Sequence, residues 1–126
     1  MKCPCCSGLT YEQCCKPYHD GKSAPTPLAL MRSRYSAYAR SLPAYIQKTT
    51  HPTGPHFNPN REEWTRDILS FCQSTRFLRL EIVCSQNDSV HFKAYLEQNS
   101  TPILLEEKSR FEKIGSDWVY FNGEIL

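Results

Sequence analysis

FLRLEIVCSQNDSVHFKAYLE, residues 77–97, is the stretch that decides the fold. Two runs in it alternate with period two, and each has its apolar residues on one face: Leu78, Leu80, Ile82 and Cys84 in the first, Val90, Phe92, Ala94 and Leu96 in the second. This period is typical of strands with one buried face. Because Gln86, Asn87 and Asp88 between the runs suit a turn, the stretch predicts an antiparallel hairpin.

Two more strands are expected after this hairpin. A second turn over residues 98–102 leads into a strand from about residue 103 to 113. After Gly115, Ser116 and Asp117, a fourth strand covers residues 118–121. The C-terminal half therefore predicts a single sheet of consecutive strands with one apolar face.

Upstream of the strands the apolar period changes to about 3.6, which is typical of helices. One stripe of this kind contains Leu28, Met31, Tyr35, Tyr38 and Leu42. Thr26 is a suitable N-cap, and Pro27 fits the first helical turn. A shorter helix is expected from Pro43 to about Gln47.

A loop with three prolines and one glycine follows at residues 51–59, and a further helix is expected over about 61–75. Asn60 and Glu63 form a candidate capping box at its start. Its apolar positions are Trp64, Ile68, Phe71 and Cys72. Helices followed by antiparallel strands predict an α+β fold, with the helices covering one face of a curved sheet.

Composition excludes several classes of protein. The 126 residues are 40% hydrophobic and 22% charged, which is typical of a globular domain. The net charge of +2, without a run of lysine or arginine, gives no strong nucleic-acid signal. No apolar stretch has the length of a membrane span, and the N-terminus lacks the apolar core of a signal peptide, so a cytoplasmic protein is expected.

Four cysteines near the N-terminus, Cys3, Cys5, Cys14 and Cys15, have the spacing C-x-C-x8-C-C. Thiolates at the two ends of a short glycine-containing turn can close a tetrahedral site around Zn²⁺. We therefore expect a zinc knuckle at residues 1–20 and an α+β domain at residues 27–126. Four sulfur ligands leave no open position on the metal, so no zinc-bound water is expected.

Alternatives to this ligand set come from neighbouring residues. His19 lies four positions after Cys15 and is a candidate to replace it as a ligand. Cys6 is an additional thiol, so the Cys5–Cys6 or Cys14–Cys15 pair could instead serve a redox protein. The total of seven cysteines fits a complete disulfide framework poorly.

A second candidate site lies in the sheet. If Ile103, Leu105 and Phe111 face inward, strand alternation also turns Glu107 and Ser109 inward. A buried carboxylate needs a partner or a wet cavity. We favour an ion pair with Arg32 or Arg34 over a pocket that contains an acid/base group. If a pocket exists, its candidate lining residues are Arg32, Arg34, Tyr35, Glu107 and Ser109.

Other residues have weaker signals. His51 and His56 lie in the proline-rich loop, where they are either solvated or at the mouth of a cavity. Cys72 and Cys84 are expected in the core. The sequence contains no glycine-rich phosphate loop, serine nucleophile elbow or HExxH motif.

The segment CPCCSGLTYEQCC, residues 3–15, resembles the zinc-binding SEC-C motif of the SecA translocation ATPase. The resemblance puts Cys3, Cys5, Cys14 and Cys15 at the ligand positions. Cys6 stands where the motif usually has glycine, and this position is not a ligand.

Further segments resemble the YchJ family of small bacterial proteins. They are CKPYH at 15–19, LMRSRYSAY at 30–38, THP at 50–52, EKSRF at 107–111 and WVYFNG at 118–123. The resemblance implies a cone-like α+β domain similar to nuclear transport factor two and ketosteroid isomerase, a fold that often encloses a cavity. It implies no catalytic residues.

These observations favour a non-catalytic, zinc-binding adaptor whose knuckle contacts a protein partner, as the SecA motif is thought to do. One alternative is a small enzyme or ligand-binding protein that uses the inside of the cone. The other alternative is the thiol redox protein.

Overall fold

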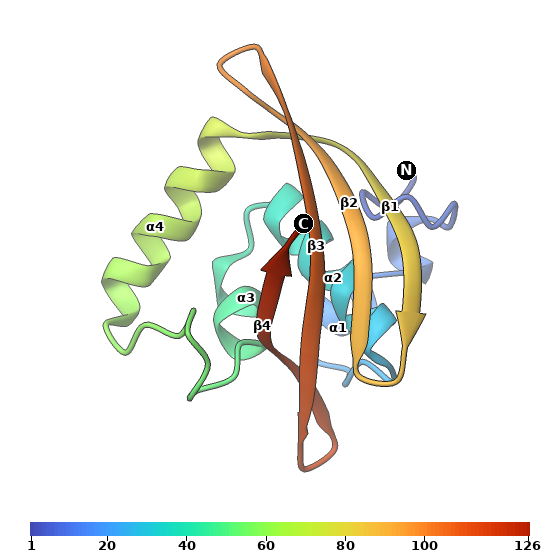
Figure 1. Ribbon diagram of the computed structural model, residues 1–126, viewed down its shortest axis with the longest axis vertical. Coiled ribbons are helices and arrows are strands. Elements are labelled where there is room, and N and C mark those ends of the chain that lie inside the picture. The colour runs from blue at the N-terminus through green and yellow to red at the C-terminus, as the bar shows by residue number, and fades with distance from the viewer.

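The structure, a computed structural model, describes residues 1–126, and its helices precede its strands (Figure 1). The helical segments are η1 (Tyr11–Gln13, a 3-10 turn), α1 (Lys16–His19), α2 (Pro27–Ala39), α3 (Pro43–Lys48) and α4 (Arg61–Ser74). The strands are β1 (Arg76–Gln86), β2 (Ser89–Gln98), β3 (Thr101–Ile114) and β4 (Asp117–Ile125). This order confirms the predicted α+β class.

The four strands form one antiparallel sheet in the order β1-β2-β3-β4. Neighbouring strands are joined by tight turns, in which Asn87 and Asn99 have positive φ angles of 50° and 51°. Asparagine tolerates this left-handed conformation better than most residues. The sheet is curved, and the helices lie together on one of its faces (Figure 1). The cone-like arrangement expected from the sequence is therefore present.

Two irregularities in β1 change which residues face the core. The register with β2 shifts between Phe77 and Arg79 and again between Ile82 and Cys84. Phe77 and Leu80 consequently both face inward, whereas Leu78 is 50% exposed and Cys84 is also exposed. The sequence prediction is wrong for Leu78 and Cys84, because an extra residue at a bulge reverses the alternation beyond it.

The predicted helix starts are confirmed by their caps. Thr26 Oγ1 accepts a hydrogen bond from the Ala29 amide at 3.1 Å, and Asn60 Oδ1 accepts one from the Glu63 amide, also at 3.1 Å. Each bond satisfies a backbone donor that has no partner within its helix. Helix α2 ends at Ala39, so Leu42 packs from the segment that follows it.

Helix α2 is buried on two sides, although its apolar stripe predicted one buried face. Ser33, Ser36 and Ala37 are each 0% exposed. A helix on a protein surface would leave such residues in water. Here the sheet covers one side of α2, and the N-terminal knuckle covers the other, so that Cys5 belongs to the same packed cluster as Leu30. None of the helices combines the length and apolar character that crossing a bilayer requires.

Candidate metal centre and interior cavity

The four sulfur atoms of the knuckle converge. The Sγ atoms of Cys3, Cys5, Cys14 and Cys15 all lie within 4.8 Å of one another. The Sγ–Sγ distance is 3.5 Å for Cys5–Cys14 and 3.8 Å for Cys14–Cys15. In a tetrahedral site with zinc–sulfur bonds of about 2.3 Å, the sulfurs are about 3.8 Å apart. The cluster therefore has the donor atoms and the spacing to bind a metal ion.

Local backbone geometry brings the two cysteine pairs together. The Cys3 amide donates to the Leu9 carbonyl at 2.9 Å, and Gly8 turns the chain between them with a φ of 90°. Cys6 also has a left-handed φ, 64°, and its side chain is exposed. Left-handed backbone favours glycine, the residue that usually occupies this position in the SEC-C motif. Cys6 is thus part of the turn and not of the sulfur cluster.

Helix α2 supplies polar contacts to the cluster. The Ser36 hydroxyl lies 3.3 Å from both Cys3 Sγ and Cys15 Sγ. Arg32 Nη1 donates to the Cys5 carbonyl at 2.9 Å and lies 3.9 Å from Cys5 Sγ. Outer contacts of this kind orient metal ligands and offset the negative charge of thiolates.

His19 has a structural role. Its Nε2 donates to the Ser33 carbonyl at 2.8 Å, and its Nδ1 accepts from the Tyr11 hydroxyl at 2.6 Å. Burial lowers the pKa of His19, which keeps the imidazole neutral, as this arrangement requires. Since both ring nitrogens are engaged, the alternative in which His19 replaces Cys15 as a ligand does not fit this geometry.

Contacts among the cysteine side chains favour negative charge on one sulfur, Cys5 Sγ. A hydrogen bond from the Cys15 thiol lowers the pKa of Cys5 well below its ordinary value. The same interaction raises the pKa of Cys15, and burial raises that of Cys14. The cluster therefore already favours one thiolate, which is the form that binds metal.

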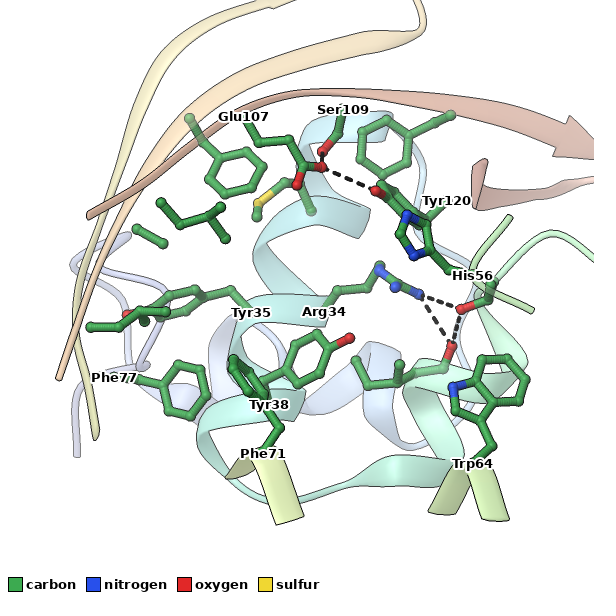
Figure 2. Close-up of a pocket in the computed structure, with 18 residues that line it drawn as sticks. Arg34, Tyr35, Tyr38, His56, Trp64, Phe71, Phe77, Glu107, Ser109 and Tyr120 are labelled. Atoms are coloured by element: carbon green, nitrogen blue, oxygen red, sulfur yellow. Dashed lines mark hydrogen bonds between the residues drawn. The ribbon is translucent and has the colours of Figure 1, made fainter. Parts of the chain in front are cut away.

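A cavity of about 340 Å³ lies on the opposite side of α2, between this helix and the sheet (Figure 2). Its apolar lining includes Met31, Ile46, Phe71, Phe77, Phe92, Ala94, Leu96, Leu105 and Phe111. Its ionisable or hydroxyl-bearing residues are Arg34, Tyr35, Tyr38, Thr50, His56, Glu107, Ser109 and Tyr120. An apolar concave site with a few convergent polar groups is typical of small-molecule binding.

Four of the five candidate pocket residues line this cavity: Arg34, Tyr35, Glu107 and Ser109. Arg32 does not, because two positions along a helix correspond to a rotation of about 200°. Arg32 therefore contacts the knuckle while Arg34 faces the cavity. The Tyr35 ring lines the wall, but its buried hydroxyl has no hydrogen-bond partner and points away from Arg34 (Figure 2).

Glu107 does not form the expected ion pair with Arg32 or Arg34. Its Oε2 accepts hydrogen bonds from the Ser109 hydroxyl at 2.5 Å and the Tyr120 hydroxyl at 3.1 Å. The prediction of an ion pair is wrong, because the groups that bind this carboxylate are neutral hydroxyl donors on β3 and β4. Burial, reinforced by Glu107, raises the pKa of Tyr120, so its phenol stays protonated and able to donate.

Gly123 makes room for this arrangement. It pairs with Ser109 across the sheet, and a Cβ on it would overlap the Glu107 carboxylate and lie 2.9 Å from the Tyr120 hydroxyl oxygen. Any larger residue at this position must displace Glu107. A glycine on β4 therefore allows the carboxylate to lie against the strand.

Arg34 is held by α3 and by the segment that follows it. Its Nη1 donates to the Ile46 carbonyl at 3.2 Å, to Thr49 Oγ1 at 2.7 Å and to Thr50 Oγ1 at 3.2 Å. This segment is itself attached to β4, because the Tyr120 amide donates to the Thr49 carbonyl at 2.7 Å. The Arg34 guanidinium also lies 4.9 Å from the centre of the Tyr120 ring.

The two loop histidines have different positions. His56 is exposed and borders the cavity, with its ring centre 5.5 Å from that of Tyr120 (Figure 2). His51 lies outside it, with Nε2 3.2 Å from Glu112. Sequence reasoning did not single out Ser36, Thr49, Thr50, Tyr120 or Gly123. For Ser36, Thr50, Tyr120 and Gly123, the only signal was that they lie in the segments LMRSRYSAY, THP and WVYFNG.

Known proteins are similar to this chain in sequence and in fold. The model of a family described as "YchJ, middle NTF2-like domain" matches residues 26–123. A UPF0225 protein of Vibrio cholerae is 37% identical over 132 residues, which cover 99% of this chain and 83% of the relative. A UPF0225 protein of Streptomyces avermitilis is 40% identical, with 98% and 84% covered.

Two solved structures carry the same motif in their descriptions. The solution structure of RPA3114, a SEC-C motif containing protein from Rhodopseudomonas palustris, has a TM-score of 0.80 and 31% identity, and the match covers 100% of this chain and 99% of that one. A SEC-C motif containing protein from Psychrobacter arcticus has a TM-score of 0.74 and 29% identity, with 98% and 82% covered.

Proposed function

The chain belongs to the YchJ family, and from this premise we propose that it is a zinc-stabilised protein that binds a small organic molecule inside its α+β cone. The observation that carries the proposal is Arg34. This side chain is only 8% exposed, faces a cavity of about 340 Å³ and has no acidic partner. Burying a guanidinium with three neutral acceptors but no counter-ion is unfavourable, so the arrangement is better explained by a ligand than by stability.

Zinc is the metal that best suits the knuckle. Four thiolates are soft ligands, and a set of four cysteine sulfurs at tetrahedral spacing is typical of structural zinc. The residues that would hold the ion are Cys3, Cys5, Cys14 and Cys15. A closed site of this kind supplies folding energy and no reactive water. Keeping these thiols reduced implies a reducing compartment such as the cytoplasm.

Helix α2 connects the proposed metal site to the proposed binding site. Arg32 and Ser36 contact the knuckle from one side of this helix, while Arg34 and Tyr38 line the cavity from the other. A knuckle locked by metal would fix the rotation of α2 about its axis. In this way the metal would position the cavity residues without contacting the ligand.

Filling the cavity tests the binding function. Ala94 is 2% exposed and lines the cavity wall, so the Ala94→Leu substitution should fill part of this space while keeping the fold. We expect mass spectrometry of natively purified protein to find a small molecule in the wild type that is absent from Ala94→Leu. The melting temperatures of the two proteins show whether the variant is folded. The same molecules in both preparations would count against binding in the cavity.

A protein partner at the knuckle is a second candidate function. The observation that favours it is the exposed apolar side chain of Leu9, 50% exposed beside the metal cluster. If this surface is an adaptor site, a pull-down with Leu9→Ser should lose partners that the wild type retains. Leu104→Ser is the matched control, because Leu104 is 55% exposed on the sheet. Partners that both variants retain would argue against an adaptor site at Leu9.

A further inference from the structure

The cavity has a cationic pole with unused hydrogen-bond donors. All three hydrogen bonds of Arg34 leave from Nη1, so Nε and Nη2 donate to no protein acceptor. Neither nitrogen is fully buried, and Arg34 lines the cavity. Two adjacent guanidinium donors match the two oxygens of a carboxylate.

An anionic pole lies on the opposite wall. Glu107 projects from β3, whereas Arg34 projects from α2 (Figure 2). Both hydrogen bonds of Glu107 go to Oε2, which leaves Oε1 as an acceptor without a donor. Glu107 forms no ion pair with a basic side chain and Arg34 forms none with an acidic one, so neither charge is neutralised within the protein.

Tyr38 lines the same cavity as Arg34 and Glu107. Burial raises the pKa of Tyr38, with the charge of Arg34 opposing the rise and that of Glu107 adding to it. This hydroxyl has no hydrogen-bond partner in the protein and is available as a neutral donor or acceptor. Most of the remaining wall is apolar, with Phe77, Phe92 and Leu96 from the sheet.

We propose that the ligand is an amphipathic molecule with an apolar body, a carboxylate that binds Arg34 and a hydrogen-bond donor, ammonium or hydroxyl, that binds Glu107. This inference rests on the proposed binding function and specifies its ligand class. A ligand whose only charged group is an anion would leave the charge of Glu107 without a partner. A ligand whose only charged group is a cation would leave the charge of Arg34 without one. A molecule with both groups satisfies both poles at once.

Three probes with related aromatic skeletons test this class by calorimetry or NMR titration. Phenylalanine has both polar groups, 3-phenylpropanoate has only the carboxylate, and 2-phenylethylamine has only the ammonium. We expect phenylalanine to bind at least tenfold more tightly than either single-group probe. Equal affinity for all three would overturn the inference while leaving cavity binding intact.

Two conservative variants assign the poles. Arg34→Lys keeps the positive charge but removes the pair of adjacent guanidinium donors. It should therefore weaken the binding of both carboxylate probes about tenfold and leave the affinity for 2-phenylethylamine unchanged. Glu107→Gln should weaken phenylalanine and 2-phenylethylamine but strengthen 3-phenylpropanoate, because it removes a repulsive charge. Amide NMR spectra establish whether each variant is folded. If only one variant folds, its binding data alone still test the pole that it changes.

The outcomes separate the two proposals. Identical changes for all probes in the folded variants would overturn the assignment of the poles. If no probe binds the wild type at millimolar concentration and Ala94→Leu carries the same small molecules as the wild type, both proposals fail. Probe binding that Ala94→Leu abolishes but the pole variants leave unaltered supports the cavity and rejects this ligand class.

Discussion

Replacing Cys15 by serine should release the metal and lower the free energy of unfolding by about 3–5 kcal/mol, because structural zinc contributes its binding energy to folding. Cys15 is 1% exposed and contacts Ser36 on α2, so loss of the knuckle also uncovers one side of that helix. Structural zinc contributes about 10–16 kcal/mol in isolated zinc-finger peptides. We expect a smaller effect here because the cone has its own apolar core.

Metal analysis and denaturation measure this effect together. Wild-type protein should contain about one zinc per chain, and Cys15→Ser much less. Chelation of the wild type should reproduce the stability of the variant. Protein that is fully folded without metal, with its four thiols freely alkylated or joined as disulfides, would refute the zinc assignment and favour the redox alternative.

Cys6 provides the matched control. It lies next to Cys5, but its side chain is exposed and its backbone is left-handed, with a φ of 64°. Cys6→Gly should keep the full zinc content and leave stability unchanged or raise it by about 1 kcal/mol, because glycine adopts this conformation without strain. A zinc loss in Cys6→Gly equal to that in Cys15→Ser would mean that the ligands are misassigned.

Features that depend on local sequence were predictable. The spacing of the four cysteines, the caps at Thr26 and Asn60 and the two turns at Asn87 and Asn99 depend on residues close together in the chain. Each was expected from short-range rules and is present in the structure.

Features that depend on contacts distant in sequence were not predictable in this way. From the sequence alone, Ser36 is an ordinary polar residue of a helix. Its contact with the metal cluster appears only in the fold, where Cys15, 21 positions away, packs against it. The bulges in β1 depend on its register with β2, so strict alternation misplaced Leu78 and Cys84.

Glu107 shows most clearly that sequence rules predict the orientation of a side chain but not its contacts with residues distant in the chain. Alternation along β3 correctly turned Glu107 inward, but it could not identify the neighbouring group. The donors are Ser109 on the same strand and Tyr120 on β4. The register between β3 and β4 shifts at Arg110 and Phe111 of β3, so the position of Tyr120 does not follow from simple alternation. Only the paired strands show that a hydroxyl, not a guanidinium, reaches this carboxylate.

Gly123→Ala should lower the free energy of unfolding by about 1 kcal/mol, because the added methyl group displaces the Glu107 carboxylate from its two hydroxyl donors. The added Cβ would overlap the Glu107 carboxylate and crowd the Tyr120 hydroxyl. Glu107 must then rotate away and lose its hydrogen bonds. Chemical denaturation measures the loss, and Glu124→Ala, at an exposed neighbouring position, is the control that should change stability by less than about 0.5 kcal/mol.

A double-mutant cycle identifies the cause of this loss. Glu107→Ala alone should cost about 1 kcal/mol, because two hydroxyls lose their acceptor. Combined with Gly123→Ala it should cost less than the sum of the two single changes, by at least about 1 kcal/mol, because the added methyl group then meets no carboxylate. Strict additivity would mean that Gly123 is needed for its own backbone, and that the space it leaves for Glu107 is incidental. A double variant that loses less stability than this sum would instead establish that glycine at position 123 serves to leave space for the Glu107 carboxylate. A fixed anionic pole in the cavity requires such space.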